Sequence, residues 1–273
     1  MPQASRARLQ AAIREGYVRV NGKPQPKTSY AVRAGDSVLC VLPPPAPLEA
    51  APEAIPLDVV YEDAHLLVVN KQAGLVTDAA HAHLADQFKA HTVERTYQAI
   101  VLGRPQRAQG RVETNVGRDL HDRKKMAAFA YMSNRGRHAS SGYEVLEGLA
   151  DGGAALLRWR LRTGRTHQIR VHARHAGHPL LGDAPYGGAA GSAVTVIARG
   201  NSERQAAVSR ALAALQRPAL HAQTLGFDHP ATGERLQFTS LLPADFEAAL
   251  VELRAVTTPD LALAGRAPPA SQW

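Results

Sequence analysis

A strand, a tight turn and a helix over residues 154–177 constrain the fold of this chain more than any other segment. Between residues 157 and 162, apolar side chains alternate strictly with basic ones. This period of two predicts a strand with one apolar face and one face of arginines. The basic residues of that face are Arg158, Arg160 and Arg162.

The turn and the helix follow directly. Gly164 permits a tight turn, Thr166 is a residue type that caps helix N-termini, and Gly177 is a type that ends helices. We therefore expect a helix between Thr166 and Gly177, with Arg165 at its N-terminus. Free backbone N–H groups favour negative charge there, so this junction is a candidate for holding an anion.

Composition limits the class of protein. The chain carries 32 Lys+Arg against 24 Asp+Glu, a net charge of +8, which favours a polyanionic partner. No run of 18 apolar residues occurs, residues 1–14 lack the apolar stretch of a secretory signal, and Cys40 is the only cysteine. We expect a cytoplasmic protein without a membrane span or a disulfide. Because Cys40 lies in an apolar run, we expect a buried structural thiol.

A proline-rich stretch divides the chain. Residues 43–56 begin with Pro-Pro-Pro-Ala-Pro, which predicts a stiff, extended linker. We expect a small domain over residues 1–42 and a large one over residues 57–257. The Ala- and Pro-rich residues 258–273 are expected to form a disordered tail.

Helices and strands interleave irregularly, without a strict βαβ period, which favours an α+β fold. In the small domain, a helix is expected at 5–16, strands at 17–20 and 38–42, and a hairpin turn at Asn21-Gly22. In the large domain, strands are expected at 57–61, 66–70, 96–102, 141–147, 154–162 and 236–240. Further helices are expected at 79–91, 205–215 and 243–256.

The N-terminal pattern resembles part of a known RNA-binding module. The helix at 5–16, "VRVNGK" and "AGDSV" are similar to the later part of the alpha-L RNA-binding domain of ribosomal proteins and RNA-modifying enzymes. In that family, basic residues of the helix and the following loop contact RNA phosphates. The residues that the resemblance proposes for this role are Arg6, Arg8, Arg14, Arg19 and Lys23. The alternative is a small αβ unit without this function.

From Leu57 to about Val256 the chain resembles an RNA pseudouridine synthase of the RluA/RluD type. Five blocks carry the resemblance in order, the most specific being residues 161–187. They read YEDAHLLVVNKQAGL (61–75), DAAHAHLADQFKAHTVERTYQAIVLG (78–103), DRKKMAAF (122–129), LRTGRTHQIRVHARHAGHPLLGDAPYG (161–187) and RPALHAQTLGFDHPATGERLQFTSLLP (217–243). The resemblance implies a mixed, largely antiparallel sheet with flanking helices.

It also implies a reaction and a set of site residues. Such enzymes detach uracil from its ribose, rotate it and reattach it through carbon 5, with no metal or cofactor, on a nucleotide that has left its stack. Arg165 maps to the arginine that holds the catalytic aspartate ionised, Tyr97 to the tyrosine that stacks on the base, and Lys71 to a neighbouring loop. The implied partner is structured RNA, with bacterial large-subunit ribosomal RNA as the first candidate and no obligate protein partner. The residues of the larger part expected to contact RNA are Arg123, Lys124, Lys125, Arg158, Arg160, Arg162 and Arg170.

The catalytic aspartate itself has no counterpart. The family carries it in a block reading His-Arg-Leu-Asp, whereas this chain runs directly from the lysine loop at 71–76 into the segment beginning at Thr77. We interpret this as an internal deletion near residues 75–78. Asp78, Asp119, Asp122 and Asp183 map elsewhere in the family pattern. The lost block should also leave apolar surface exposed and strand edges unpaired.

Two other interpretations remain open. A non-catalytic RNA-binding protein would use the same basic residues, through salt-dependent phosphate contacts. A metal site could be suspected from His167, His172, His175 and His178, but their spacing matches no usual zinc framework, and we expect no metal. The target uridine, the RNA and the oligomeric state do not follow from the sequence.

Overall fold

The computed structural model describes residues 6–25, 27–42, 55–72 and 82–259. The chain divides into two compact units, Met1–Pro56 and Leu57–Trp273. The predicted deletion site at 75–78, most of the linker at 43–56 and most of the tail at 258–273 lie outside the described residues.

The described residues of the first unit form one helix and a three-stranded antiparallel sheet. Helix α1 (Arg6–Arg14) precedes β1 (Val18–Val20), β2 (Lys23–Pro24) and β3 (Val38–Cys40), in the order β2-β1-β3. The Asn-Gly turn is confirmed: Asn21 and Gly22 have φ of 52° and 78°, the left-handed region that this turn type needs. The Asn21 amide donates a hydrogen bond to Asp36 at 2.8 Å, which ties this turn to the next one.

The expectation of a buried Cys40 is wrong. All three residues of β3 are exposed, including the thiol-bearing Cys40. The buried apolar side chains described in this unit are Ala12, Val18 and Val20. A core of this size covers only one face of a short sheet, so apolar residues on the edge strand remain in contact with solvent.

The second unit is built on a seven-stranded sheet, and the predicted α+β class is confirmed. The strand order is β12-β11-β6-β10-β9-β7-β8, and every neighbouring pair is antiparallel. The strands are β6 (Glu94–Leu102), β7 (Gln109–Arg118), β8 (Met126–Phe129), β9 (Arg137–Leu149), β10 (Ala154–Leu161), β11 (Leu220–Asp228) and β12 (Arg235–Thr239). The helices are α2 (Ala82–Ala90), α3 (Gln168–His175), α4 (Ala190–Ala193), α5 (Ser202–Leu215) and α6 (Ala244–Ala255).

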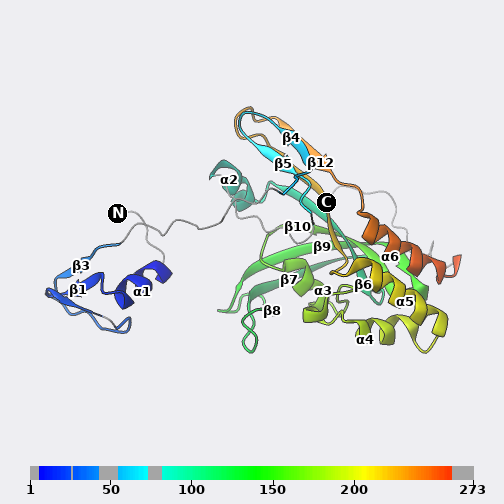
Figure 1. Cartoon of the computed structure of the whole chain (residues 1–273), viewed down its shortest axis with the longest axis horizontal. Coiled ribbons are helices and arrows are strands. Elements are labelled where there is room, and N and C mark those ends of the chain that lie inside the picture. Colours follow the sequence, from blue (N-terminus) through cyan, green and yellow to red (C-terminus); the bar gives the residue numbers. More distant parts are fainter. Residues whose placement is uncertain (1–5, 26, 43–54, 73–81, 260–273) are drawn as a thin grey trace. The chain divides into compact units, whose positions relative to one another are not determined.

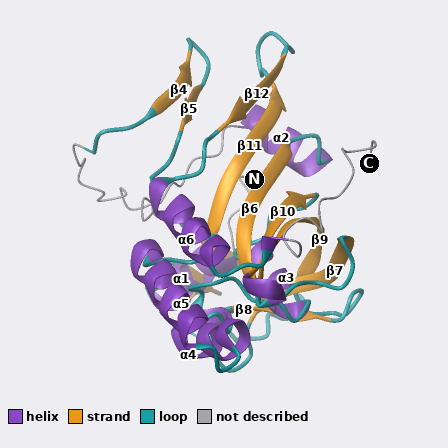
Figure 2. Cartoon of the chain, turned by 90° about the vertical axis from the view of Figure 1, so that its right-hand side faces the viewer, coloured by secondary structure: helices purple, strands orange, loops and turns teal. Residues whose placement is uncertain are grey.

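Helices cover both faces of this sheet. On the inner strand β6, Ile100 and Leu102 point into a core completed by α5 and α6, which lie side by side in Figure 2. Ala99 and Val101 point the opposite way, into a core completed by Ile169 of α3 and Trp159 of β10. Two-sided burial explains why residues 99–102 of β6 and residues 154–157 of β10 are apolar without a break.

Three strands of the seven-stranded sheet were not predicted from the sequence, and β9 begins earlier than expected. β7 carries many polar residues, and β8 is a run of only four apolar residues, too short to show a period. β11 has irregular burial, and β9 begins at Arg137 instead of residue 141. β7, β8 and β9 are successive strands in which β7 pairs with both others, and β11 pairs with β12 and with β6, which is distant in sequence. A local period of hydrophobicity does not report such pairing.

Helix α3 starts later than its sequence predicts. The expected cap at Thr166 is wrong: the helix starts at Gln168, and its N-cap is His167, with φ of 57° and no capping side chain. Arg165 therefore lies in the turn before the helix. The expected end is confirmed, since Gly177 follows α3 with φ of 83°.

A separate two-stranded hairpin precedes the large sheet in sequence. Strands β4 (Val59–Glu62) and β5 (Leu67–Val69) pair with each other and with no other described strand. The hairpin lies beside β12 (Figure 1), held by a 2.8 Å contact between Asp63 and His229 and by packing of Tyr61 on Phe238. Several of its apolar side chains stay 45–50% exposed, namely those of Leu57, Val59, Val60 and Leu67.

Candidate active site

Arg165 stands where β10 turns toward α3. Its Nε donates a hydrogen bond to the backbone carbonyl of His138 at the start of β9, at 2.9 Å. Partial burial lowers the pKa of the Arg165 guanidinium, and the positive charges of Arg137 and Arg95 lower it further. The charged groups that influence Arg165 most are thus other cations.

Arg95 and Tyr97 approach the same turn from β6. The guanidinium of Arg95 lies 5.1 Å above the ring of Phe88, and its Nη1 touches Gly164, where a Cβ would collide with it. Two positions along the strand, Tyr97 packs against the core that contains Trp159. Burial raises the pKa of the Tyr97 phenol, and the nearby charge of Arg95 partly offsets this rise. The absence of a side chain at Gly164 therefore leaves room for the Arg95 guanidinium beside the β10–α3 turn.

The arginines of this site have no carboxylate partner within the described part of the chain. Neither Arg95 nor Arg165 takes part in an ion pair there. The Nε of Arg95 is buried and has no hydrogen-bond partner among the described residues. Asp119 accepts bonds from the backbone of its own loop, and Asp78 lies outside the described residues.

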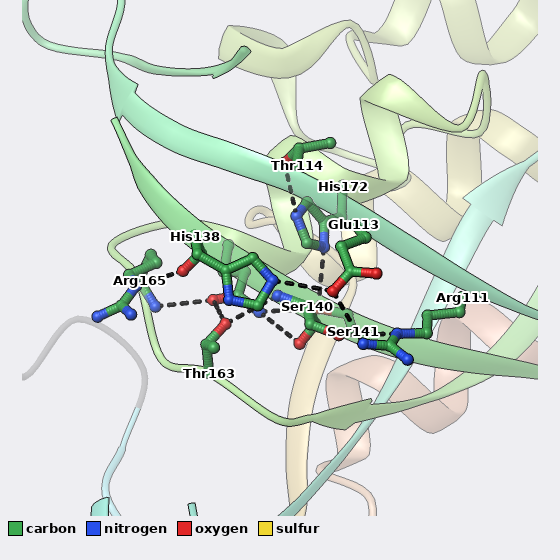
Figure 3. A network of polar contacts seen from close by, with 10 residues as sticks. Arg111, Glu113, Thr114, His138, Ser140, Ser141, Thr163, Arg165 and His172 are labelled. Carbon is green, nitrogen blue, oxygen red and sulfur yellow. Dashed lines mark hydrogen bonds and ion pairs between the residues drawn. The ribbon is translucent and has the colours of Figure 1, made fainter. Parts of the chain in front are cut away.

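Gln168 fixes the backbone next to Arg165. Its Oε1 accepts hydrogen bonds from the backbone N–H of Arg165 at 2.9 Å and from the hydroxyl of Thr163 at 2.8 Å. Its Nε2 donates to the carbonyl of Ser140 at 3.1 Å and to the hydroxyl of Ser141 at 2.9 Å. One buried amide thus links the turn to β9, and Figure 3 shows the Arg165 guanidinium directed away from this network.

His172 extends the network into the core. It is fully buried, with Nδ1 2.9 Å from the hydroxyl of Ser141 and Nε2 3.0 Å from that of Thr114 (Figure 3). Burial, together with the charges of His175 and His138, lowers its pKa to about 4. The ring is therefore neutral at pH 7, bonded to two hydroxyls that can each donate or accept. No local signal marks this role, because a histidine on a helix looks the same in sequence whether it is buried or exposed.

Arg170 is engaged by a buried carboxylate. It forms a two-bond fork with Asp183, at 2.8 and 2.7 Å, and the Asp183 side chain is fully buried. The guanidinium also stacks 4.6 Å from the ring of Tyr186, whose hydroxyl bonds to His167. This arrangement gives Arg170 and Asp183 a structural function at the turn after α3.

The structure places the other basic residues that the sequence predicted to contact RNA or to lie in the active site. Arg6 and Arg8 lie in α1. Lys71 follows β5, and its Nζ lies 3.1 Å from the carbonyl of Gln72. Two are paired with carboxylates: Arg158 with Glu144 at 3.0 Å, and the half-buried Lys125 with Asp122 at 3.5 Å. The exposed residues are Arg14, Arg19, Lys23, Arg123, Lys124, Arg160 and Arg162.

The histidines after Arg165 do not converge on a common point. His172 and His178 bond to protein groups, the latter to the carbonyl of Leu102 at 3.0 Å. Across the described residues no three or more His, Cys, Asp or Glu side chains are arranged to hold a metal ion. None of the described helices is long and apolar enough to cross a membrane.

Comparison with known proteins decides the family. Residues 76–175 match the model of the RNA pseudouridylate synthase family, and residues 1–38 match that of the S4 domain. The chain is 37% identical to RNA pseudouridine synthase 2, chloroplastic, of Arabidopsis thaliana, over 88% of this chain and 75% of that protein. The chain belongs to the RNA pseudouridine synthase family. RNA is accordingly its substrate class.

Two further proteins are similar to this chain, one in sequence and one in fold. The chain is 33% identical to ribosomal large subunit pseudouridine synthase D of Zymomonas mobilis, over 89% of this chain and 87% of that protein. The structure of human RNA pseudouridylate synthase domain containing 1 shares the fold, with a TM-score of 0.53 and 21% identity over 71% of this chain and 87% of that one. The alignment with the Arabidopsis protein spans 322 positions, more than the 273 residues of this chain. The relative therefore has residues with no counterpart here.

Proposed function

We propose that this chain binds structured RNA as its family does, with large-subunit ribosomal RNA as the target class, but does not turn uridine over by itself. The observation that carries the proposal is the state of Arg165. The charges that act on it most are those of Arg95 and Arg137, and no described carboxylate pairs with it. The family resemblance implies that Arg165 keeps a catalytic carboxylate ionised, but no carboxylate among the described residues pairs with Arg165.

The exposed hairpin β4–β5 supports an internal deletion. Strands that are apolar on both faces belong in the middle of a sheet or between layers. Val59, Val60 and Leu67 fit that pattern, yet each is 45–50% exposed. The alignment with the Arabidopsis protein contains positions at which this chain has no residue, which agrees with a missing segment. From the sequence pattern we place that segment between Leu75 and Asp78.

Other observations support ribosomal RNA as the target. The name of the Zymomonas relative refers to the ribosomal large subunit. The S4 match adds a second RNA-binding unit, in which Arg14, Arg19 and Lys23 are exposed. We also propose a cytoplasmic location for this chain, whereas the Arabidopsis relative is named as chloroplastic.

The second candidate is an active pseudouridine synthase. It is favoured by the Arg95 side chain, which reaches from the strand that carries Tyr97 to Gly164 in the turn of Arg165. This enzyme would need a carboxylate from a segment outside the described residues, and Asp78 is the nearest one in sequence to that junction.

Tritium release from uridine-labelled large-subunit ribosomal RNA separates the two candidates. The full chain should release no tritium above the no-enzyme level while binding the same RNA in a filter assay. A chimera that receives the corresponding segment of the Zymomonas relative between Val76 and Thr77 should gain turnover. Robust release by the unaltered chain, abolished by Asp78→Asn, would establish the second candidate instead.

A further inference from the structure

Three arginines gather at one turn without a counter-charge among the described residues. Arg95 comes from β6, Arg165 from the β10–α3 turn, and Arg137 from the first position of β9. Arg165 Nε is bonded to the carbonyl of His138, the residue after Arg137, and Arg95 Nη1 lies against Gly164, the residue before Arg165. We call these three residues the arginine cluster.

The protein leaves much of the hydrogen-bonding capacity of this cluster unused. A guanidinium has five N–H donors. The hydrogen bond described for the Arg165 side chain is the one to His138, and Arg95 Nε is buried with no partner in the described part of the chain. A buried N–H of a charged group loses its hydrogen bonds to water, and without a protein acceptor nothing replaces them. Such donors are therefore rarely left without a partner. The ring of Phe88 under Arg95 attracts its charge but offers no acceptor atom.

The other charged residues near this turn do not supply the missing acceptor. Glu113 is held by Arg111 at 2.8 Å and by His138 at 2.9 Å. Asp183 forms an ion pair with Arg170, which lies in α3. The cluster is therefore a concentration of positive charge in which like charges repel and donors lack acceptors.

We propose that Arg95, Arg137 and Arg165 form a binding site for an oxyanion of the phosphate class, and that a phosphodiester of bound RNA occupies it in the working protein. Guanidinium forks match the tetrahedral oxygens of phosphate with two bonds each. An anion would satisfy the buried Nε of Arg95 and remove the repulsion between the three cations. The choice of RNA as the source of the phosphate rests on the proposed RNA binding, whereas the site itself does not.

Inorganic phosphate is the probe for the site. With the full chain at constant ionic strength, phosphate replacing chloride should raise the midpoint of thermal unfolding and broaden the ³¹P resonance in a saturable manner. Arg165→Gln and Arg95→Gln should each weaken phosphate binding about tenfold or more, which corresponds to loss of one charge-assisted pair. Arg165→Lys, which keeps the charge but lacks the fork, should fall between these variants and the unaltered protein.

Arg107→Gln is the matched control. Arg107 is exposed beyond the other end of β6, and its substitution removes the same single charge. The phosphate affinity of this variant should equal that of the unaltered protein. Equal weakening in all variants, or no saturable phosphate binding by the unaltered chain, would overturn the site.

Competition with RNA distinguishes the natural source of the anion. If a phosphodiester of RNA occupies the cluster, phosphate should weaken RNA binding more than chloride does at equal ionic strength. Arg165→Gln should lose this excess effect, and Arg107→Gln should keep it. Phosphate binding without competition would overturn the RNA part of the proposal, and phosphate binding without any RNA binding would refute the proposed function while leaving the site established.

Discussion

The side chain of Gln168 accepts a hydrogen bond from the backbone N–H of Arg165 at 2.9 Å. The same oxygen accepts from Thr163, and the amide nitrogen donates to Ser140 and Ser141 on β9. One buried side chain thus sets the conformation of the turn that presents Arg165.

Replacing Gln168 with leucine should destabilise the protein by about 3 kcal/mol, because the Arg165 N–H and the Thr163 hydroxyl would lose a buried acceptor. The measurement is the free energy of unfolding from urea denaturation of the full chain. Gln205→Leu, on an exposed position of α5, should change this free energy by less than about 0.5 kcal/mol. Equal effects of the two substitutions would contradict the role given to Gln168.

The stability of the fold should fall in mild acid because of His172. Its pKa is about 4 in the folded protein, against 6.5 for an unperturbed histidine, so between these values the unfolded chain binds more protons. The stabilising contribution is complete above pH 6.5 and is lost as the pH falls toward 4. The loss should be on the order of 3 kcal/mol, measured as the unfolding free energy against pH.

His172→Gln should flatten this pH dependence, since an amide does not titrate in this range. His175→Gln removes an exposed imidazole from the same helix and should leave the slope nearly unchanged. If both variants keep the slope of the unaltered protein, another group is responsible for the acid sensitivity.

Substitution of Arg170 should lower the stability of the fold, whereas substitution of Arg160 should weaken RNA binding. Arg170→Gln strands the fully buried carboxylate of Asp183 and should cost about 3–5 kcal/mol of folding free energy. Arg160→Gln removes an exposed charge on β10 and should weaken RNA binding with little effect on the unfolding free energy. A stable Arg170→Gln variant that has lost RNA affinity would reverse this assignment.

RNA affinity should depend on salt through the basic loop before β8. Lys124 is exposed there, so Lys124→Gln should reduce the slope of log affinity against log salt by roughly one. Arg210→Gln removes an equal charge from α5, where Arg210 pairs with Glu252 at 2.7 Å, and should not alter the slope. An unchanged slope for Lys124→Gln would remove this loop from the RNA contact surface.

Local sequence patterns predicted the structure correctly where a single residue type, or one period of hydrophobicity, determines the backbone conformation. The Asn21-Gly22 turn, the end of α3 at Gly177 and the α+β class all followed from such signals. Local patterns failed where packing decides. Cys40 is exposed because it lies on the edge strand of a sheet whose small core covers only one face, and β7 forms because it pairs between β8 and β9.

The sequence by itself determined the family and the residue types of the site, because the spacing around Arg165 is a local property of the chain. Only the tertiary structure decided which of those residues meet. It brought Arg95 from β6 against Gly164, gave Arg170 to Asp183, and joined Gln168 and His172 to β9. Contacts between strands far apart in sequence depend on pairing and burial across the whole sheet, which no single segment encodes.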